Sequence, residues 1–223
     1  MKKWIAIALA AAAFSVFVRD TPPAFAQQGQ DITLPAPQTR GGMPLMEALA
    51  QRRSAREFSP RELPSQMLSD LLWAAAGINR PDSGKRTAPT ARNMQEIEVY
   101  AVLPGGAYCY DPQAHALRFV AAGDLRPLTG MQPFVAAAPL NLVYVADLSK
   151  MGDVSPEGQT LYSGTDTGFI SENVYLFAAS AGLATVVRGS VEREALTKAL
   201  ALGADRKIVL TQTVGYPAAP QEE

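Results

Sequence analysis

The segment APLNLVYVAD, residues 138–147, constrains the fold more than any other part of the chain. Most of its positions are apolar, and its length is that of a single strand. Such a run is typical of a central strand that is buried on both faces of a sheet. Helical patterns precede and follow it, so we predict an α+β domain in which helices flank a central mixed or antiparallel sheet.

The other elements follow from the periodicity of apolar residues and from Gly and Pro signals. Ser65 is the predicted N-cap of the second helix, and Gly77 and Gly182 are predicted to end the second and third helices. The predicted helices cover 44–53, 65–76, 168–181 and 192–202. The predicted strands cover 96–104, 107–111, 115–121, 138–147, 185–187 and 207–217.

The N-terminus has the pattern of a signal peptide. Lys2 and Lys3 precede an apolar run from Trp4 to Val18, and the sequence AFA at 24–26 is a typical cleavage pattern. A membrane anchor is the competing interpretation, but the run is short for a bilayer span. We therefore predict export, cleavage after Ala26 and a periplasmic mature protein without a membrane segment.

The remaining chain is predicted to form one domain. Residues 27–43 are polar and rich in Pro and Gly, which indicates an extended N-terminal arm; the domain proper covers 44–217, and 218–223 form a short tail. The chain has one Cys and one His, which gives little material for a disulfide, a metal site or a catalytic triad. Its net charge of −1 argues against nucleic-acid binding. We therefore predict no metal ligand and no catalytic side chain, and expect the chemistry to come from a cofactor.

Three arginines lie within five positions where the first predicted helix ends. Arg52, Arg53 and Arg56 surround Ser54 in the segment QRRSAREF, residues 51–58. Cations are favourable at a helix C-terminus and are commonly solvated there. A cradle for an anion is the alternative, because a guanidinium fork matches a phosphate group.

Four motifs in order resemble the nitroreductase-like flavoprotein family, in particular its branch of SagB-type dehydrogenases. They are QRRSAREF at 51–58, RTAPTARNMQEIEVYAV at 86–102, ENVYLFAASAGLATVVRG at 172–189 and VLTQTVGYP at 209–217. The resemblance covers roughly residues 44 to 217. It implies a nitroreductase-like fold, an intertwined homodimer and FMN as cofactor, and it favours the anion cradle over the solvated cluster.

The resemblance also implies which residues hold FMN. Arg52 and Arg53 match positions that meet the phosphate, Ser54 matches one that hydrogen-bonds it, and Arg56 matches the cation beside the flavin pyrimidine. A surface ion pair of Arg56 with Glu57 or Glu62 is the alternative.

Two further motifs match flavin contacts in the family. In the loop APTARN, Pro89, Thr90, Ala91 and Asn93 match residues that reach the flavin of the partner subunit. Arg188 and Gly189 match positions that present backbone N–H groups to the flavin. Relatives often have an acidic or small residue in place of Arg188, so its side chain is expected to face solvent or the substrate.

The implied activity is an FMN-dependent oxidoreductase with a ping-pong mechanism and a small organic acceptor such as a nitroaromatic or a quinone. NAD(P)H is the usual donor of the family but is scarce in the periplasm, so another donor stays open. Two alternatives remain at this point. One is a flavin-binding protein without turnover, and the other is a structural or interaction protein that has kept the fold and lost FMN.

Overall fold

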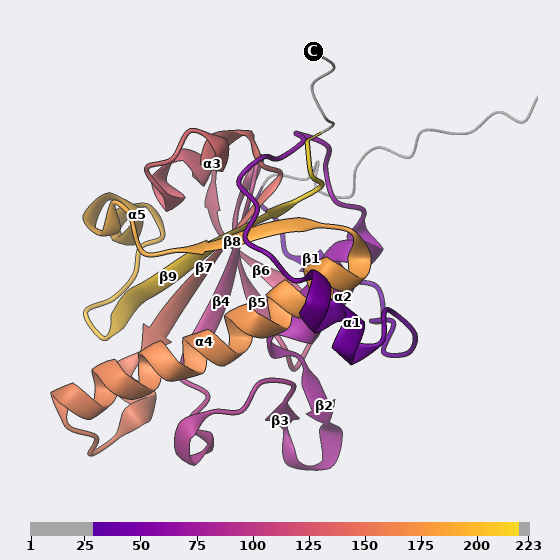
Figure 1. The fold of residues 1–223 in the computed structure, drawn as a ribbon. Helices are drawn as coiled ribbons and strands as arrows, with labels where there is room; N and C mark the ends of the chain where they lie inside the picture. The colour runs from indigo at the N-terminus through magenta and orange to yellow at the C-terminus, as the bar shows by residue number, and fades with distance from the viewer. Residues whose placement is uncertain (1–28, 219–223) are drawn as a thin grey trace, which may run out of the picture.

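The computed structural model describes residues 29–218, and a seven-stranded sheet forms its centre (Figure 1). The strand order is β1-β6-β5-β4-β7-β9-β8, and every neighbouring pair is antiparallel. The strands are β1 Ile32–Thr33, β4 Ile97–Leu103, β5 Gly106–Asp111, β6 Ala116–Ala122, β7 Leu140–Asp147, β8 Ala184–Arg188 and β9 Arg206–Gly215. A separate hairpin consists of β2 Ile78–Arg80 and β3 Lys85–Arg86. The predicted signal peptide lies outside the described residues.

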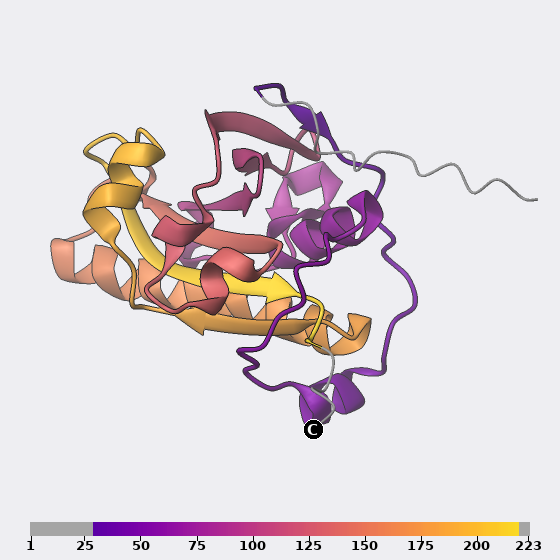
Figure 2. The same ribbon diagram turned by 90° about the horizontal axis from the view of Figure 1, so that it is seen from above.

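Helices cover both faces of the sheet, as the view from above shows (Figure 2). Their bounds are α1 Leu45–Gln51, α2 Ser65–Ala76, α3 Phe134–Ala137, α4 Pro156–Ala181 and α5 Arg193–Ala199. Short 3₁₀ turns are η1 Pro81–Ser83, η2 Ala91–Asn93, η3 Arg126–Thr129 and η4 Leu148–Met151. Across residues 29–218, no helix is both long enough and apolar enough to cross a bilayer. The α+β prediction is confirmed, with a sheet that is antiparallel throughout.

Strand β7 is buried on both faces, as its sequence predicted. Leu142 and Tyr144 point into the core cluster that includes residues of α2 and α4. Val143 and Val145 point into a second cluster that includes Leu196 of α5. The alternation along one strand therefore joins the two hydrophobic layers of the domain.

Helix α4 is longer than the sequence predicted. It begins at Pro156, where the Ser155 hydroxyl accepts the N–H of Gly158 at 3.2 Å, and it ends at Gly182 in the left-handed conformation with φ 67°. The predicted end is confirmed. The predicted start at Gly168 was wrong, because glycines and polar residues before it weaken the helical pattern while Ser155 and Pro156 supply a good N-terminus.

The start of α2 also differs from its prediction. Ser65 is the first helical residue, and Pro64 takes the N-cap position without a side-chain hydrogen bond. Ser65 is therefore not the N-cap. Pro64 has φ −57°, the value that proline prefers, so the chain enters the helix without a polar cap.

Residues 32–34 of the N-terminal arm join the sheet and the core. Ile32 and Thr33 pair with β6, and Leu34 is buried in the main core cluster. The Pro35 carbonyl accepts the Ser69 hydroxyl at 2.6 Å and lies 3.1 Å from His115 Nε2. These contacts fasten the arm to α2 and to the β5–β6 turn.

Candidate functional site

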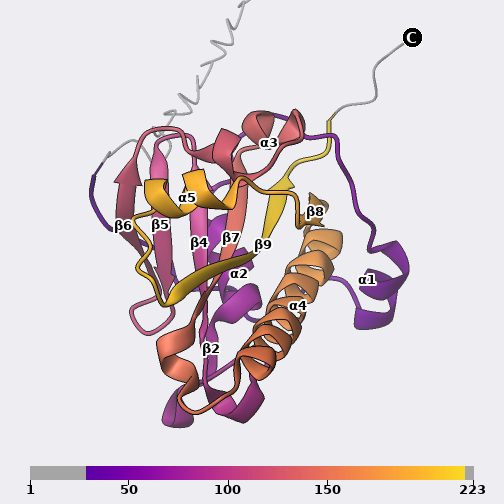
Figure 3. The ribbon, with the colours of Figure 1, turned by 90° about the vertical axis from the view of Figure 1, so that its left-hand side faces the viewer.

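The arginine segment leaves α1 and runs in extended form beside β8. Helix α1 ends where the Arg52 N–H bonds the Ala48 carbonyl at 2.9 Å, and three residues later the Ala55 N–H bonds the Thr185 carbonyl at 3.0 Å. Figure 3 shows α1 beside the C-terminal part of α4. The segment is thus held between the end of α4 and β8, with its polar side chains along the surface.

Tyr175 on α4 joins this segment to β8. Its hydroxyl lies 2.8 Å from the Ser54 hydroxyl and accepts the N–H of Val187 at 3.0 Å. The Arg52 guanidinium carbon lies 5.3 Å from the centre of the Tyr175 ring, within the range of a cation–π contact. The sequence pattern indicated only core packing for Tyr175, because the spacing of a helix does not reveal what a buried hydroxyl meets.

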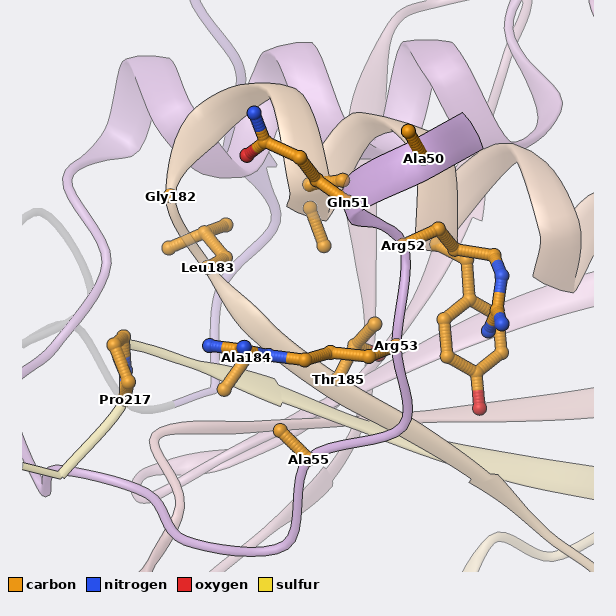
Figure 4. A pocket seen from close by; sticks show the side chains of 13 residues that line it. Ala50, Gln51, Arg52, Arg53, Ala55, Gly182, Leu183, Ala184, Thr185 and Pro217 are labelled. Carbon is orange, nitrogen blue, oxygen red and sulfur yellow. The ribbon is translucent and has the colours of Figure 1, made fainter. Parts of the chain in front are cut away.

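A cavity of about 530 Å³ opens beside the arginine segment (Figure 4). It is lined by residues of α1, the end of α4, the start of β8 and Pro217. Arg52 and Arg53 are its only cations, and their guanidinium groups form no hydrogen bond or ion pair with any of residues 29–218. Figure 4 shows Arg53 extended past Thr185, while Arg52 lies over the ring of Tyr175. The remaining walls are mostly small apolar side chains and backbone.

Arg56 lies on the exposed continuation of the same segment. Neither Glu57 nor Glu62 forms an ion pair with it among the residues that the structure covers. The surface ion pair considered from the sequence is therefore not formed. Within one chain, the structure therefore brings Arg52 and Arg53 to the cavity and leaves Ser54 and Arg56 exposed beside it, outside its lining.

The loop with the sequence APTARN lies further along α4. The Ala91 N–H donates to Asp166 at 2.8 Å, and the Thr90 hydroxyl accepts the N–H of Gln95 at 2.9 Å. Arg92, Asn93 and Gln95 all have positive φ, between 51° and 57°, which is uncommon for residues other than glycine. Backbone of this kind clusters at functional sites.

The loop and the arginine cavity are separate within one chain. Asp166, which anchors the loop, precedes Tyr175 by nine residues, or about 14 Å along the helix axis. None of the matched loop residues lines the cavity, and Pro89 and Asn93 are exposed. The arginine segment and the APTARN loop, which both match flavin-contacting motifs, therefore lie on two separate surfaces of a single chain.

Comparisons with known proteins agree on one family. The sequence profile of the Nitroreductase family matches residues 49–216. The chain belongs to the nitroreductase family. A Ralstonia eutropha structure described as a nitroreductase candidate is 46% identical, covers 88% of this chain and 94% of its own, and superposes with a TM-score of 0.83.

A second relative supports the same assignment, and a more distant structure shares the fold. A Methanocaldococcus jannaschii protein whose name assigns it to the nitroreductases is 30% identical over 156 residues, which are 66% of this chain and 78% of that protein. An Anabaena variabilis structure of similar description shares the fold, with 22% identity, a TM-score of 0.70, and coverage of 88% of this chain and 43% of that one. The chain is thus a nitroreductase-family oxidoreductase with the corresponding α+β fold.

The Arg188 side chain of this nitroreductase-family chain is buried, contrary to the prediction that it faces solvent or substrate. It donates to the Thr129 carbonyl at 2.9 Å, to Asn141 Oδ1 at 3.1 Å and to Thr213 Oγ1 at 2.7 Å. Gly130 leaves room for it, because a Cβ there would meet Arg188 Nη1 at 1.7 Å. Burial lowers the pKa of Arg188 to about 10, since no carboxylate pairs with it among the described residues.

Gly189 lies exposed just after β8. A Cβ at this position would have only Leu210 within 4 Å, at 3.8 Å, so no neighbour within the chain requires a glycine there. Lys85 and Arg86, two further basic residues, form β3 and do not line the arginine cavity. Among the described residues, no three or more His, Cys, Asp or Glu side chains gather as a metal site would require.

Proposed function

We propose that this nitroreductase-family oxidoreductase binds FMN with its phosphate between Arg52 and Arg53. The observation that carries the proposal is a pair of guanidinium groups at the edge of a cavity that have no hydrogen-bond or ion-pair partner among residues 29–218. A phosphate dianion would neutralise both groups through charge-assisted hydrogen bonds. The cavity volume of about 530 Å³ lies in the usual range for small-molecule sites, so the cavity has room for part of an FMN molecule.

Other residues near the two arginines would also contact or orient FMN. Tyr175 fixes the Ser54 hydroxyl, which would add a neutral donor to the phosphate. Arg56 would stabilise negative charge on the flavin pyrimidine, and Arg188 and Gly189 would offer backbone N–H groups to the flavin edge. When bound, FMN supplies the redox chemistry, passing a hydride or electrons between two substrates. The chain itself would bind, orient and supply charge, with no side chain acting as acid or base.

A homodimer is part of the proposal, with Pro89, Thr90, Ala91 and Asn93 reaching the FMN of the partner subunit. The separation of the loop from the cavity supports this arrangement. Helix α4 also has an exposed face with Leu161 and Phe169, between which Gly164 and Gly168 leave open space. Exposed apolar groups around small residues allow close helix packing, and apolar surfaces of this kind often mark protein interfaces.

Further exposed apolar side chains lie on α1, beside the cavity. Leu45, Met46 and Leu49 are 63%, 76% and 46% exposed. A second subunit that covered them would bury the opening of the cavity together with α1. The proposed dimer is therefore obligate, an arrangement that typically buries about 2,000 Å² or more.

We further propose that the mature protein is periplasmic and belongs to the SagB-type branch. The N-terminal pattern of residues 1–26 supports export, and the RTAPTARN motif supports the branch. The proposed reaction is ping-pong transfer to a small organic acceptor such as a nitroaromatic or a quinone. NAD(P)H is one candidate donor, and the proposed compartment favours a donor that is available outside the cytoplasm.

The absorption spectrum of the purified protein tests the cofactor proposal. Protein that is reconstituted with FMN and freed of excess ligand should show flavin bands at one FMN per chain, and these bands should bleach when a reductant is added. Binding without bleaching would favour a flavin-binding protein without turnover. Absence of flavin bands after reconstitution would refute the proposal.

A further inference from the structure

Two carboxyl groups are buried beneath the loop of residues 89–95. Glu96 directly follows the loop and is fully buried, and Asp166 on α4 is 2% exposed. Neither Glu96 oxygen has a hydrogen-bond partner among residues 29–218. An ionised carboxylate without donors is strongly disfavoured in a protein interior, so Glu96 is best accommodated with a proton.

Asp166 is the buried anchor of the loop. Its Oδ2 accepts the Ala91 N–H at 2.8 Å. The Arg92–Asp153 ion pair also ties the loop to the rest of the chain, but both side chains are largely exposed, and such pairs contribute little. Gln95 adds a bond from its side chain to the Gly84 carbonyl at 3.1 Å. A loop with three residues at positive φ depends on anchors of this kind, because its backbone conformation is intrinsically unfavourable.

The charged groups around Glu96 come from three elements. The charges that act on Glu96 are those of Asp166 on α4, Lys150 on η4 and Arg86 on β3. Burial raises the pKa of Glu96 to about 7, the Asp166 carboxylate adds to the rise, and Lys150 opposes it. Arg86 does not neutralise Glu96 by direct contact, because no ion pair joins the two side chains.

We propose that Glu96 carries a proton in its buried position, and that this proton keeps the 89–95 loop in place. With the proton present, Glu96 is neutral and Asp166 Oδ2 remains available to the Ala91 N–H. When the proton is released to solvent, two carboxylates face each other in a buried site and repel. Asp166 then moves away from Glu96 and weakens its bond to Ala91, so the loop loosens.

The effect on flavin binding rests on the proposed function. The dependence of the 89–95 loop on the proton of Glu96, which we call the latch, does not. If the loop completes the FMN site of the partner, Asp166 is a positioning residue for that site. Loosening the loop above neutral pH would then weaken FMN binding without changing any residue that touches the cofactor.

Amide hydrogen exchange of the 89–95 loop tests the latch in the FMN-free mature protein. After correction for the intrinsic pH dependence of exchange, protection of the Ala91 amide should fall by about tenfold between pH 5.5 and pH 8.5. Glu96→Gln keeps the shape of the side chain but cannot ionise, so its protection should be independent of pH. Asp166→Asn keeps an acceptor for Ala91 and should also remove the pH dependence. It serves as a second test if Glu96→Gln fails to fold.

Glu98→Gln is the matched control. Glu98 lies two residues further along the chain, in β4, and its oxygens are paired with Arg206 at 2.9 and 3.3 Å. This variant should keep the pH dependence of the wild-type loop. A flat profile in the wild type, or a pH dependence that persists in Glu96→Gln, would overturn the proposal. Because the measurement needs no flavin, its failure is distinct from failure of FMN binding.

Discussion

The Tyr175 hydroxyl lies 2.8 Å from the Ser54 hydroxyl and thereby connects α4 to the arginine segment. The same oxygen accepts the Val187 N–H, so one side chain fixes the segment relative to β8 as well. The position of Ser54, next to the two arginines that line the cavity, is therefore set by a residue that is distant in sequence. This relationship has a measurable consequence.

Tyr175→Phe should lower the free energy of unfolding by about 0.5–1.5 kcal/mol, the usual net contribution of a neutral hydrogen bond. It should also weaken FMN binding several-fold, because Ser54 loses its orientation. Tyr162→Phe is the control, since Tyr162 lies on the same helix and its hydroxyl forms no hydrogen bond to the described residues. Denaturant unfolding and FMN titration measure both effects. Equal behaviour of the two variants would contradict the role given to Tyr175.

Arg52→Ala should weaken FMN far more than riboflavin, because only FMN carries the phosphate that the guanidinium would neutralise. Loss of one charge-assisted contact should cost about 1.5–3 kcal/mol of FMN binding free energy. Titrations with both ligands measure the difference. Arg40→Ala removes an exposed arginine outside the cavity and should leave both affinities unchanged. If Arg52→Ala weakened the binding of both ligands equally, Arg52 would not be a phosphate contact.

The sequence predicted those parts of the fold that depend on local pattern. The apolar run of β7 indicated burial on both faces, and Gly182 marked the end of α4, because strand length and the left-handed conformation are local properties. The start of α4 was missed, since three glycines lie within 158–168 and lower its helical propensity.

Of the candidate site, only the residues that belong to sequence motifs could be predicted. The arginines were identified from their spacing and from the family resemblance, and two of them, Arg52 and Arg53, line one cavity. The Tyr175 hydroxyl, the buried Arg188 side chain and the Glu96–Asp166 pair could not be found in this way. Each depends on contacts between segments tens of residues apart, which neither periodicity nor a short motif encodes.

Arg188→Met should leave the stability of the protein unchanged or raise it slightly. The buried guanidinium has no carboxylate partner, and replacing such a charge with an apolar side chain of similar length removes a desolvation cost. Its acceptors keep other donors, because the Thr129 carbonyl also accepts from Thr211 and Asn141 Oδ1 also accepts from Thr213.

Arg188→Ala should instead destabilise the protein by about 2 kcal/mol or more, because the shorter side chain leaves a cavity. Denaturant unfolding of both variants checks the pair of expectations. A loss above about 1 kcal/mol in Arg188→Met would show that the hydrogen bonds of the guanidinium outweigh its desolvation.

His115 should make the protein less stable on acidification. Burial lowers the pKa of His115, so the unfolded chain binds a proton more readily and stability is lost as pH falls through about 6.5. His115→Asn should remove this loss, and asparagine tolerates the φ of 47° at this position.

Glu96 acts in the opposite direction, because its raised pKa means that stability is lost as pH rises from about 4.5 toward 7. The effect of His115 is therefore best measured in a Glu96→Gln background. In that background, unfolding free energies between pH 5 and 7.5 should rise with pH, and adding His115→Asn should flatten the curve. A curve that keeps its slope after the histidine is replaced would contradict the prediction.

Mixed dimers should show that each FMN site draws on both subunits. Arg52→Ala removes the phosphate contact of one subunit, and Thr90→Trp places a bulky ring in the loop that would reach the partner's flavin. Each variant alone should bind FMN poorly as a homodimer. In a heterodimer, the wild-type Arg52 of one subunit meets the wild-type Thr90 of the other, so one of the two sites is intact. Heterodimers purified through two different tags should therefore carry one FMN per two chains.

If both residues served a cofactor within one chain, no intact site would form and the heterodimer would bind no FMN. A monomer that carries stoichiometric flavin in sedimentation would contradict the shared site as well.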